Sequence, residues 1–143
     1  MSNYMVQLPE GVRVEEATET FGRFVVQPLE RGYGVTIGNA LRRVLLSSLP
    51  GVAITAVRID GVQHEFSTIP GVTEDVAEII LNLKGVRFKA KDTTDANIRL
   101  SLKGPHVWTA RDIAEATSHY EVLNPDHYIA TLAEGAEVNL ELR

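Results

Sequence analysis

The chain has 143 residues, enough for one domain with a hydrophobic core, and its 44% hydrophobic and 23% charged residues are usual for a soluble globular protein. The formal net charge of −5 provides no overall positive field, so no direct contact with nucleic acid is expected. The sequence has no cysteine, which excludes disulfides and thiolate metal sites and suits the cytoplasm, and no apolar run approaches the about 20 residues of a membrane span.

The first third of the chain predicts strands. Alternating apolar residues indicate one or two strands around Val12, Val14, Phe24 and Val26, and the alternation breaks near Gly22. We expect these strands to pack on the helix that follows them.

That helix is short, unusually apolar and expected from about Thr36 to Leu49. Thr36 or Asn39 is expected to cap its start, and the Pro50-Gly51 pair to fix its end. Leu46 and Leu49 point away from the main apolar stripe, and a helix with apolar residues on several sides must be covered on several sides. This segment is therefore expected to meet another protein chain. The stripe that is expected to be buried consists of Ile37, Leu41, Val44, Leu45 and Ser48.

Two glycines and two arginines mark the same segment. Gly32 and Gly34 permit positive φ angles or the close approach of another chain. Arg42 and Arg43 lie mid-helix and point about 100° apart, so one of them can face a partner while the other does not. The alternative is that both arginines are solvated, as exposed charges usually are.

Residues 52–67 predict a β-hairpin. Val52 to Ile59 and Val62 to Ser67 are its strands, and Asp60-Gly61 is a strong two-residue turn between them. Further strands are expected at VRFKAK, NIRLSLKG, HVWTA, YEVLN, YIATL and EVNLELR, with a single helical turn at ARDIAEA.

A second helix is expected from Glu74 to Lys84. Thr73 is its predicted cap, Glu74 and Asp75 lie at the positive end of its dipole, and Gly85 is placed to end it. Its predicted core stripe consists of Val76, Ile79, Ile80 and Leu83.

The residue types used in catalysis are present without a catalytic arrangement. Ser47 and Ser48 lie in no nucleophile motif, and Glu74 and Asp75 suit a helix start better than an acid–base pair. The histidines form no metal-binding pattern, so no catalytic residue, cofactor or metal site is expected. They are His64, His106, His119 and His127.

The main rival interpretation is a small phosphate- or nucleotide-binding domain that uses Gly32–Gly38 together with Arg42 and Arg43. Glycines before a helix can hold an anion. The spacing matches neither known glycine-rich phosphate motif, and the arginines lie too far into the helix to reach its first-turn N–H groups.

Two long strings carry a resemblance to a known family. FVVQPLERGYGVTIGNALRRVLLSSLPG and VRIDGVQHEFSTIPGVTEDVAEIILNLKG resemble the N-terminal region of the bacterial RNA polymerase alpha subunit, without a gap from about Phe24 to Lys84. The resemblance continues more weakly through HYEVLNPDHYIATLAEGAEVNLELR.

The resemblance implies an α+β fold with two subdomains. Residues 1–50 would be the first segment of a dimerisation subdomain, and residues 51–143 a mainly antiparallel β subdomain with one main helix, inserted into it and incomplete at its C-terminal end. The return segment and the DNA-contacting C-terminal domain of the family would be absent, so we interpret the chain as a fragment. The uncovered helix is then expected to self-associate, or alternatively to rearrange onto the β subdomain.

The resemblance also implies a function. Two alpha subunits dimerise and recruit the beta and beta-prime subunits, which hold the magnesium-dependent nucleotidyltransferase site, so this chain would be a non-catalytic assembly subunit. The implied dimerisation residues are Ile37, Leu41, Val44, Leu45 and Leu49. The implied large-subunit contacts are Arg42, Arg43, Leu46, Ser47, Glu65, Ser67, Thr68, Glu74, Asp75, Glu78 and Lys84.

Overall fold

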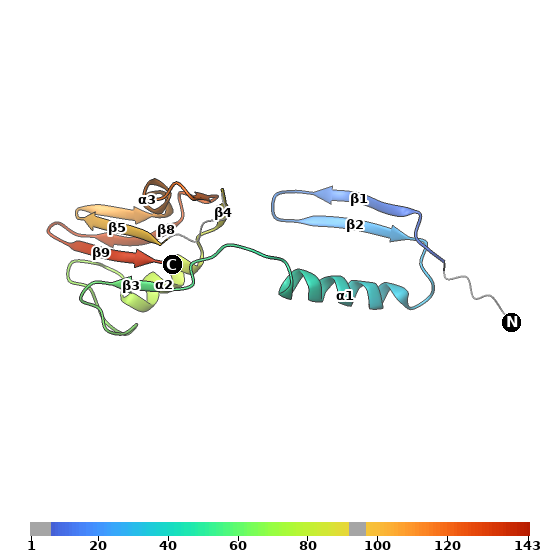
Figure 1. The fold of residues 1–143 in the computed structure, drawn as a ribbon, viewed down its shortest axis with the longest axis horizontal. Helices are drawn as coiled ribbons and strands as arrows, with labels where there is room; N and C mark the ends of the chain where they lie inside the picture. Colours follow the sequence, from blue (N-terminus) through green and yellow to red (C-terminus); the bar gives the residue numbers. More distant parts are fainter. Residues whose placement is uncertain (1–6, 92–96) are drawn as a thin grey trace. The chain divides into compact units, whose positions relative to one another are not determined.

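The computed structural model describes residues 7–91 and 97–143, and the chain separates into two compact units (Figure 1). The first unit is Met1–Pro50 and the second is Gly51–Arg143. Mixed helices and antiparallel strands confirm the predicted α+β class.

The first unit consists of a β-hairpin and one helix. Strand β1 (Gly11–Ala17) pairs antiparallel with β2 (Gly22–Gln27), so the prediction of one or two strands is confirmed as two. The Oγ1 of Thr18 accepts a hydrogen bond from the Phe21 N–H at 3.0 Å and closes the turn between them.

Helix α1 (Tyr33–Ser47) begins three residues earlier than predicted. Its N-cap is Gly32, whose φ of 91° is left-handed, while Thr36 and Asn39 lie inside the helix. The predicted caps are therefore wrong, because the glycine turn already sets the start of the helix. The helix also ends earlier than expected, at Ser47.

The predicted buried stripe of α1 is wrong in this structure. No residue of α1 is buried, and only Ile37 is half-buried. The hairpin does not cover the helix as expected, since its apolar side chains Val12, Val14 and Phe24 are exposed instead of packed on α1. Every buried hydrophobic side chain among the described residues belongs to the second unit, beginning with Ile59.

The second unit is built from antiparallel strands and two helices. Its central sheet has the order β3-β9-β5, and two further pairs, β4-β7 and β6-β8, complete the strands that the structure describes. The predicted strands after residue 85 and the helical turn at ARDIAEA are confirmed. The bounds are β3 Val57–Ile59, α2 Val76–Lys84, β4 Phe88–Ala90, β5 Ile98–Lys103, β6 His106–Thr109, α3 Ala110–Glu115, β7 Tyr120–Val122, β8 Tyr128–Leu132 and β9 Glu137–Leu142.

This unit has a well-defined core. Alternate residues of β5 and β9 are buried, as expected for a sheet with one solvent face. Helix α2 directs Val76, Ile79 and Leu83 into the core and leaves Ile80 half-buried, which confirms its predicted stripe.

The predicted hairpin over residues 52–67 is wrong. The turn exists, with Gly61 at φ 78°, but the chain after it does not pair with β3. Strand β3 pairs instead with β9, so that Ile59 faces Leu140 and Val57 faces Leu142. The distant apolar strand is preferred because the residues after the turn are mostly polar and bury little surface.

Helix α2 is capped by Asp75, so the prediction of Thr73 as the cap is wrong. The Asp75 Oδ1 accepts from the Glu78 N–H at 2.8 Å, and the Glu78 carboxylate accepts from the Asp75 N–H at 3.3 Å. Thr73 lies two residues before the N-cap position, where its N–H donates to the Thr131 carbonyl of β8. Gly85 is the C-cap, as predicted.

Candidate subunit interfaces

The apolar face of α1 contains the residues predicted for dimerisation. Ile37, Leu41 and Leu45 are spaced four residues apart and Val44 lies beside them, so they share one side of the helix. The exposed fractions are 54% for Leu41 and 63% for Leu45. Leu49, also predicted for this contact, follows the helix and is exposed as well.

Helix α1 has little stability of its own. Gly34 and Gly38 lie inside it, and each costs roughly 1 kcal/mol relative to alanine. Its cap forms no side-chain hydrogen bond, and no acidic first-turn or basic last-turn residue complements its dipole. Isolated helices of about 15 residues are marginal in water, so α1 needs a covering surface.

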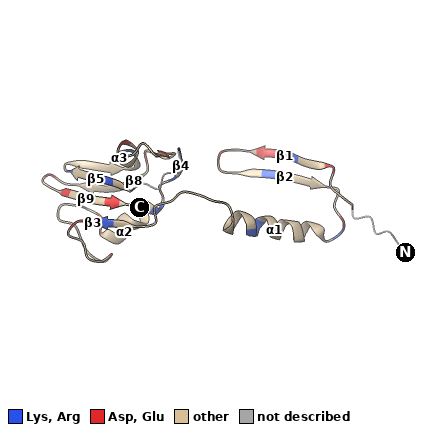
Figure 2. Cartoon of the chain, in the orientation of Figure 1, with Lys and Arg blue, Asp and Glu red and all other residues tan. Residues whose placement is uncertain are grey.

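The arginine pair lies in the middle of α1, where Figure 2 shows a basic band. Arg42 and Arg43 are exposed, and neither forms an ion pair within the part of the chain that the structure describes. Leu46, one turn from Arg42, is 73% exposed. Ser47 is different, because its hydroxyl donates to the Arg43 carbonyl and so has a partner within the helix.

A second group of predicted contacts lies in the loop before α2. Ser67 lies in a turn in which its N–H donates to the His64 carbonyl and its Oγ lies 3.3 Å from His64 Nδ1. The Ser67 carbonyl accepts from the Val76 N–H, which ties the turn to α2. Glu65 and Thr68 are exposed on this ordered loop.

Glu74, predicted as a partner contact, is occupied within the chain. Its Oε2 accepts from the Thr131 N–H at 2.8 Å, and its Oε1 accepts from the Tyr128 hydroxyl. Burial raises the pKa of Glu74, but these hydrogen bonds outweigh it and lower the pKa below the ordinary 4.5. Burial and the bond to Glu74 raise the pKa of Tyr128. Glu74 therefore holds the loop against β8.

Of the other predicted contacts on α2, Asp75 and Glu78 form the capping box, and Lys84 is exposed at the last residue of the helix.

The predictions from the sequence missed two exposed apolar residues of this region. Phe66 is 80% exposed in the loop, and Leu81 is 66% exposed on α2. The sequence could have indicated Leu81, because this leucine lies outside the core stripe of its helix. It could have indicated Phe66, because this aromatic residue lies in an otherwise polar loop.

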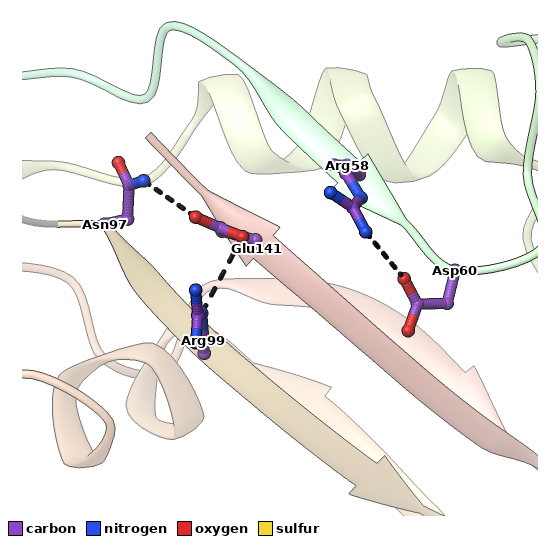
Figure 3. A network of polar contacts seen from close by, with 5 residues as sticks. All are labelled: Arg58, Asp60, Asn97, Arg99 and Glu141. Atoms are coloured by element: carbon purple, nitrogen blue, oxygen red, sulfur yellow. Dashed lines mark hydrogen bonds and ion pairs between the residues drawn. The ribbon is translucent and has the colours of Figure 1, made fainter.

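The outer face of the central sheet has a shallow hollow of about 500 Å³. The Glu141 carboxylate accepts a hydrogen bond from the Asn97 side chain at 2.7 Å and lies 3.7 Å from the Arg99 guanidinium (Figure 3). Arg58 and Asp60 lie 3.9 Å apart. These opposite charges neutralise one another, so the hollow is a solvated polar face without an excess charge for a ligand.

The structure keeps the histidines in separate surroundings. His106 Nε2 lies 2.8 Å from Asp112, and His127 Nε2 lies 2.8 Å from the Asn82 carbonyl. No cluster of three potential metal ligands occurs among residues 7–91 and 97–143. Within the same residues, no helix is long and apolar enough to cross a membrane.

Comparison with known proteins gives the family. Residues 57–143 match the family described as the RNA polymerase Rpb3/RpoA insert domain. The chain belongs to this family. The matched residues begin at β3 and include the whole core of the second unit. The resemblance seen in the sequence is thereby confirmed.

Relatives of this family cover both units. The chain is 69% identical over all of its 143 residues to the DNA-directed RNA polymerase subunit alpha of Salinibacter ruber, covering 44% of that protein. It is 57% identical to the subunit of Prosthecochloris aestuarii and 56% identical to that of Chlorobaculum tepidum, in each case over 97% of the chain and 43% of the relative. The chain therefore spans less than half the length of these relatives.

Proposed function

We propose that this chain is a non-catalytic assembly part of a bacterial RNA polymerase in the cytoplasm. It dimerises with a second alpha subunit and scaffolds the beta and beta-prime subunits for DNA-dependent RNA synthesis. The observation that carries the proposal is the uncovered apolar face of α1 in a chain whose relatives are polymerase alpha subunits.

The energetic argument concerns the side chains on that face. Leu41, Val44, Leu45 and Leu49 are each about half exposed or more. Burying apolar surface contributes roughly 25 cal/mol per Å², so a few leucines represent several kcal/mol of driving force for association. Covering the face also stabilises a helix that is otherwise marginal. Dimerisation through α1 supplies both contributions.

The arginine pair supports a separate contact with a large subunit. Arg42 and Leu46 are four residues apart and share the side of α1 away from the apolar stripe. An exposed arginine beside an exposed leucine suits an interface, where arginine is enriched. We assign Arg42, Arg43 and Leu46 to this contact, and the loop and α2 residues from Glu65 to Lys84 to a further one.

The phosphate-binding alternative finds no support in the geometry. Gly34 and Gly38 are part of the helix instead of forming a loop before it. Arg42 and Arg43 lie more than two turns from Tyr33, the first helical residue, so they do not adjoin its free N–H groups.

Light scattering and capture of purified beta and beta-prime subunits test the two contacts separately. Leu41→Glu with Leu45→Glu is expected to reduce self-association, and Asn39→Glu, which adds one charge on another side of α1, is the control. Arg43→Ala is expected to weaken capture of a large subunit by about 30-fold, since an interface arginine is typically worth about 2 kcal/mol or more. A monomeric wild-type chain that captures neither large subunit would refute the proposal.

A further inference from the structure

The strand pair β4-β7 has one face toward the core. Phe88 pairs with Val122 and Ala90 with Tyr120 in the antiparallel register. The Phe88 and Tyr120 rings meet edge to face at 6.2 Å, and both side chains are half-buried against the core. The opposite face of this pair is therefore the solvent face.

The ladder continues past the ends of β4. The Leu123 N–H donates to the Arg87 carbonyl, and the Lys91 N–H donates to the His119 carbonyl, both at 2.9 Å. Successive side chains of an extended strand point to opposite faces. Arg87, Lys89 and Lys91 therefore lie together on the solvent face, and all three are exposed.

This row of cations continues from α2. The Arg87 guanidinium donates to the carbonyl of Lys84, the last residue of the helix, at 3.1 Å. We call Lys84, Arg87, Lys89 and Lys91 the basic strip. Because Lys84 already belongs to the proposed large-subunit contact, the strip adjoins that contact without a break.

Unlike the basic residues of the central sheet, the basic strip forms no ion pair within the part of the chain that the structure describes. Arg58, Arg99 and Lys103 each lie within 4 Å of a carboxylate on the central sheet. In the strand register Glu121 faces Lys89, and among the described residues of this strand pair that one carboxylate is outnumbered by Arg87, Lys89 and Lys91.

We propose that the basic strip extends the large-subunit contact of α2 over β4 and β7 and receives an acidic segment of that subunit. The inference rests on the proposed function. Arg87, Lys89 and Lys91, on and directly beside β4, recur at every second position, about 6.8 Å apart, which suits an extended segment with alternating carboxylates. Leu123, 56% exposed beside Arg87, adds an apolar contact that a phosphate backbone cannot use. The chain's net charge of −5 likewise favours a protein partner over DNA.

The test measures association of the 143-residue chain with purified beta and beta-prime subunits at two salt concentrations. Lys89→Glu with Lys91→Glu is expected to slow association about 10-fold at low salt and to have little effect at high salt, because charges at the edge of an interface act mainly on the rate of encounter. Arg99→Glu with Lys103→Glu reverses the same number of charges on the central sheet and is the matched control. Lys89 faces Glu121 across the strand pair, so a glutamate at position 89 places two like charges opposite each other and destabilises the pair. The milder pair Lys89→Gln and Lys91→Gln removes the positive charges without that repulsion and is measured beside it.

The outcomes separate this inference from the proposed function. If Leu81→Glu, at an exposed position of α2 outside the capping box, weakens large-subunit binding but neither strip pair does, the strip is not part of the contact while the proposed function stands. If wild-type chain binds neither large subunit, the proposed function fails first. A fluorescent DNA duplex is titrated in parallel, and duplex binding that depends on Lys89 and Lys91, with unchanged large-subunit association, would overturn the choice of a protein partner.

Discussion

Gly38→Ala is expected to stabilise α1 in the free chain. Gly38 lies inside the helix, and a methyl group added there would meet nothing within 4 Å apart from its chain neighbours and the backbone of its own helix. The substitution therefore gains the full difference in helix propensity, about 1 kcal/mol, or roughly a fivefold rise in the equilibrium constant for helix formation. Gly34 is equally open, so both substitutions together are expected to contribute about 2 kcal/mol.

Gly32→Ala is the matched control and is expected to act in the opposite direction. Its added methyl group also meets no atom within 4 Å, but its φ of 91° strains any residue with a Cβ by about 1–2 kcal/mol. Far-UV circular dichroism at several protein concentrations, with amide exchange of residues 39–46, measures the helix. If Gly38→Ala leaves helicity unchanged while Gly32→Ala raises it, α1 does not begin at Tyr33 and the reasoning is wrong.

Three further predictions concern the second unit. Gly104→Ala is expected to cost about 3 kcal/mol or more in urea denaturation, because its methyl group would overlap the backbone carbonyl of Ala133; a near-wild-type midpoint would contradict this packing. Asp75→Ala removes the cap of α2 and is expected to cost about 1 kcal/mol in the same assay, and an unchanged midpoint would mean that the capping box contributes nothing. The lowered pKa of Glu74 stabilises the fold above the unfolded value of 4.5, and this contribution is lost as pH falls through the folded pKa. Glu74→Gln should therefore lower stability at pH 7 and flatten the acid part of the profile, and an unaltered pH profile would show that the Thr131 bond is not formed in solution.

The sequence predicted those parts of the fold whose signals are local. The stripe of α2 could be read because apolar residues recur every three to four positions, and strands such as β5 because they alternate. The pairing of β3 with β9 could not be predicted, since Ile59 and Leu140 are 81 positions apart. The nearby Asp-Gly turn offered a local hairpin as a plausible alternative. Glycine N-caps such as Gly32 leave no side-chain signal either.

Predictions about the site met a similar limit. The helical periodicity alone predicted that Leu41 and Leu45 are buried, and their exposure was expected only from the resemblance, in which an absent return segment would cover them. The role of Glu74 could not be predicted from the sequence, because its partners Tyr128 and Thr131 lie more than 50 positions away and only the fold brings them to the loop. Residue types could mark Glu74 as acidic and near a helix start, but not as a residue already occupied.

The two units obtain their stability in different ways, which bears on how assembly would proceed. The second unit buries Trp108, Ile113, Ile129 and similar side chains completely, so its own core can hold the loop and α2 in place before any partner arrives. Residues 7–50 bury no side chain completely, so α1 gains its cover only on association. Under the proposed function, folding of α1 is then coupled to dimerisation, and its helix content rises with protein concentration. The second unit would keep the same circular dichroism and melting behaviour across that range.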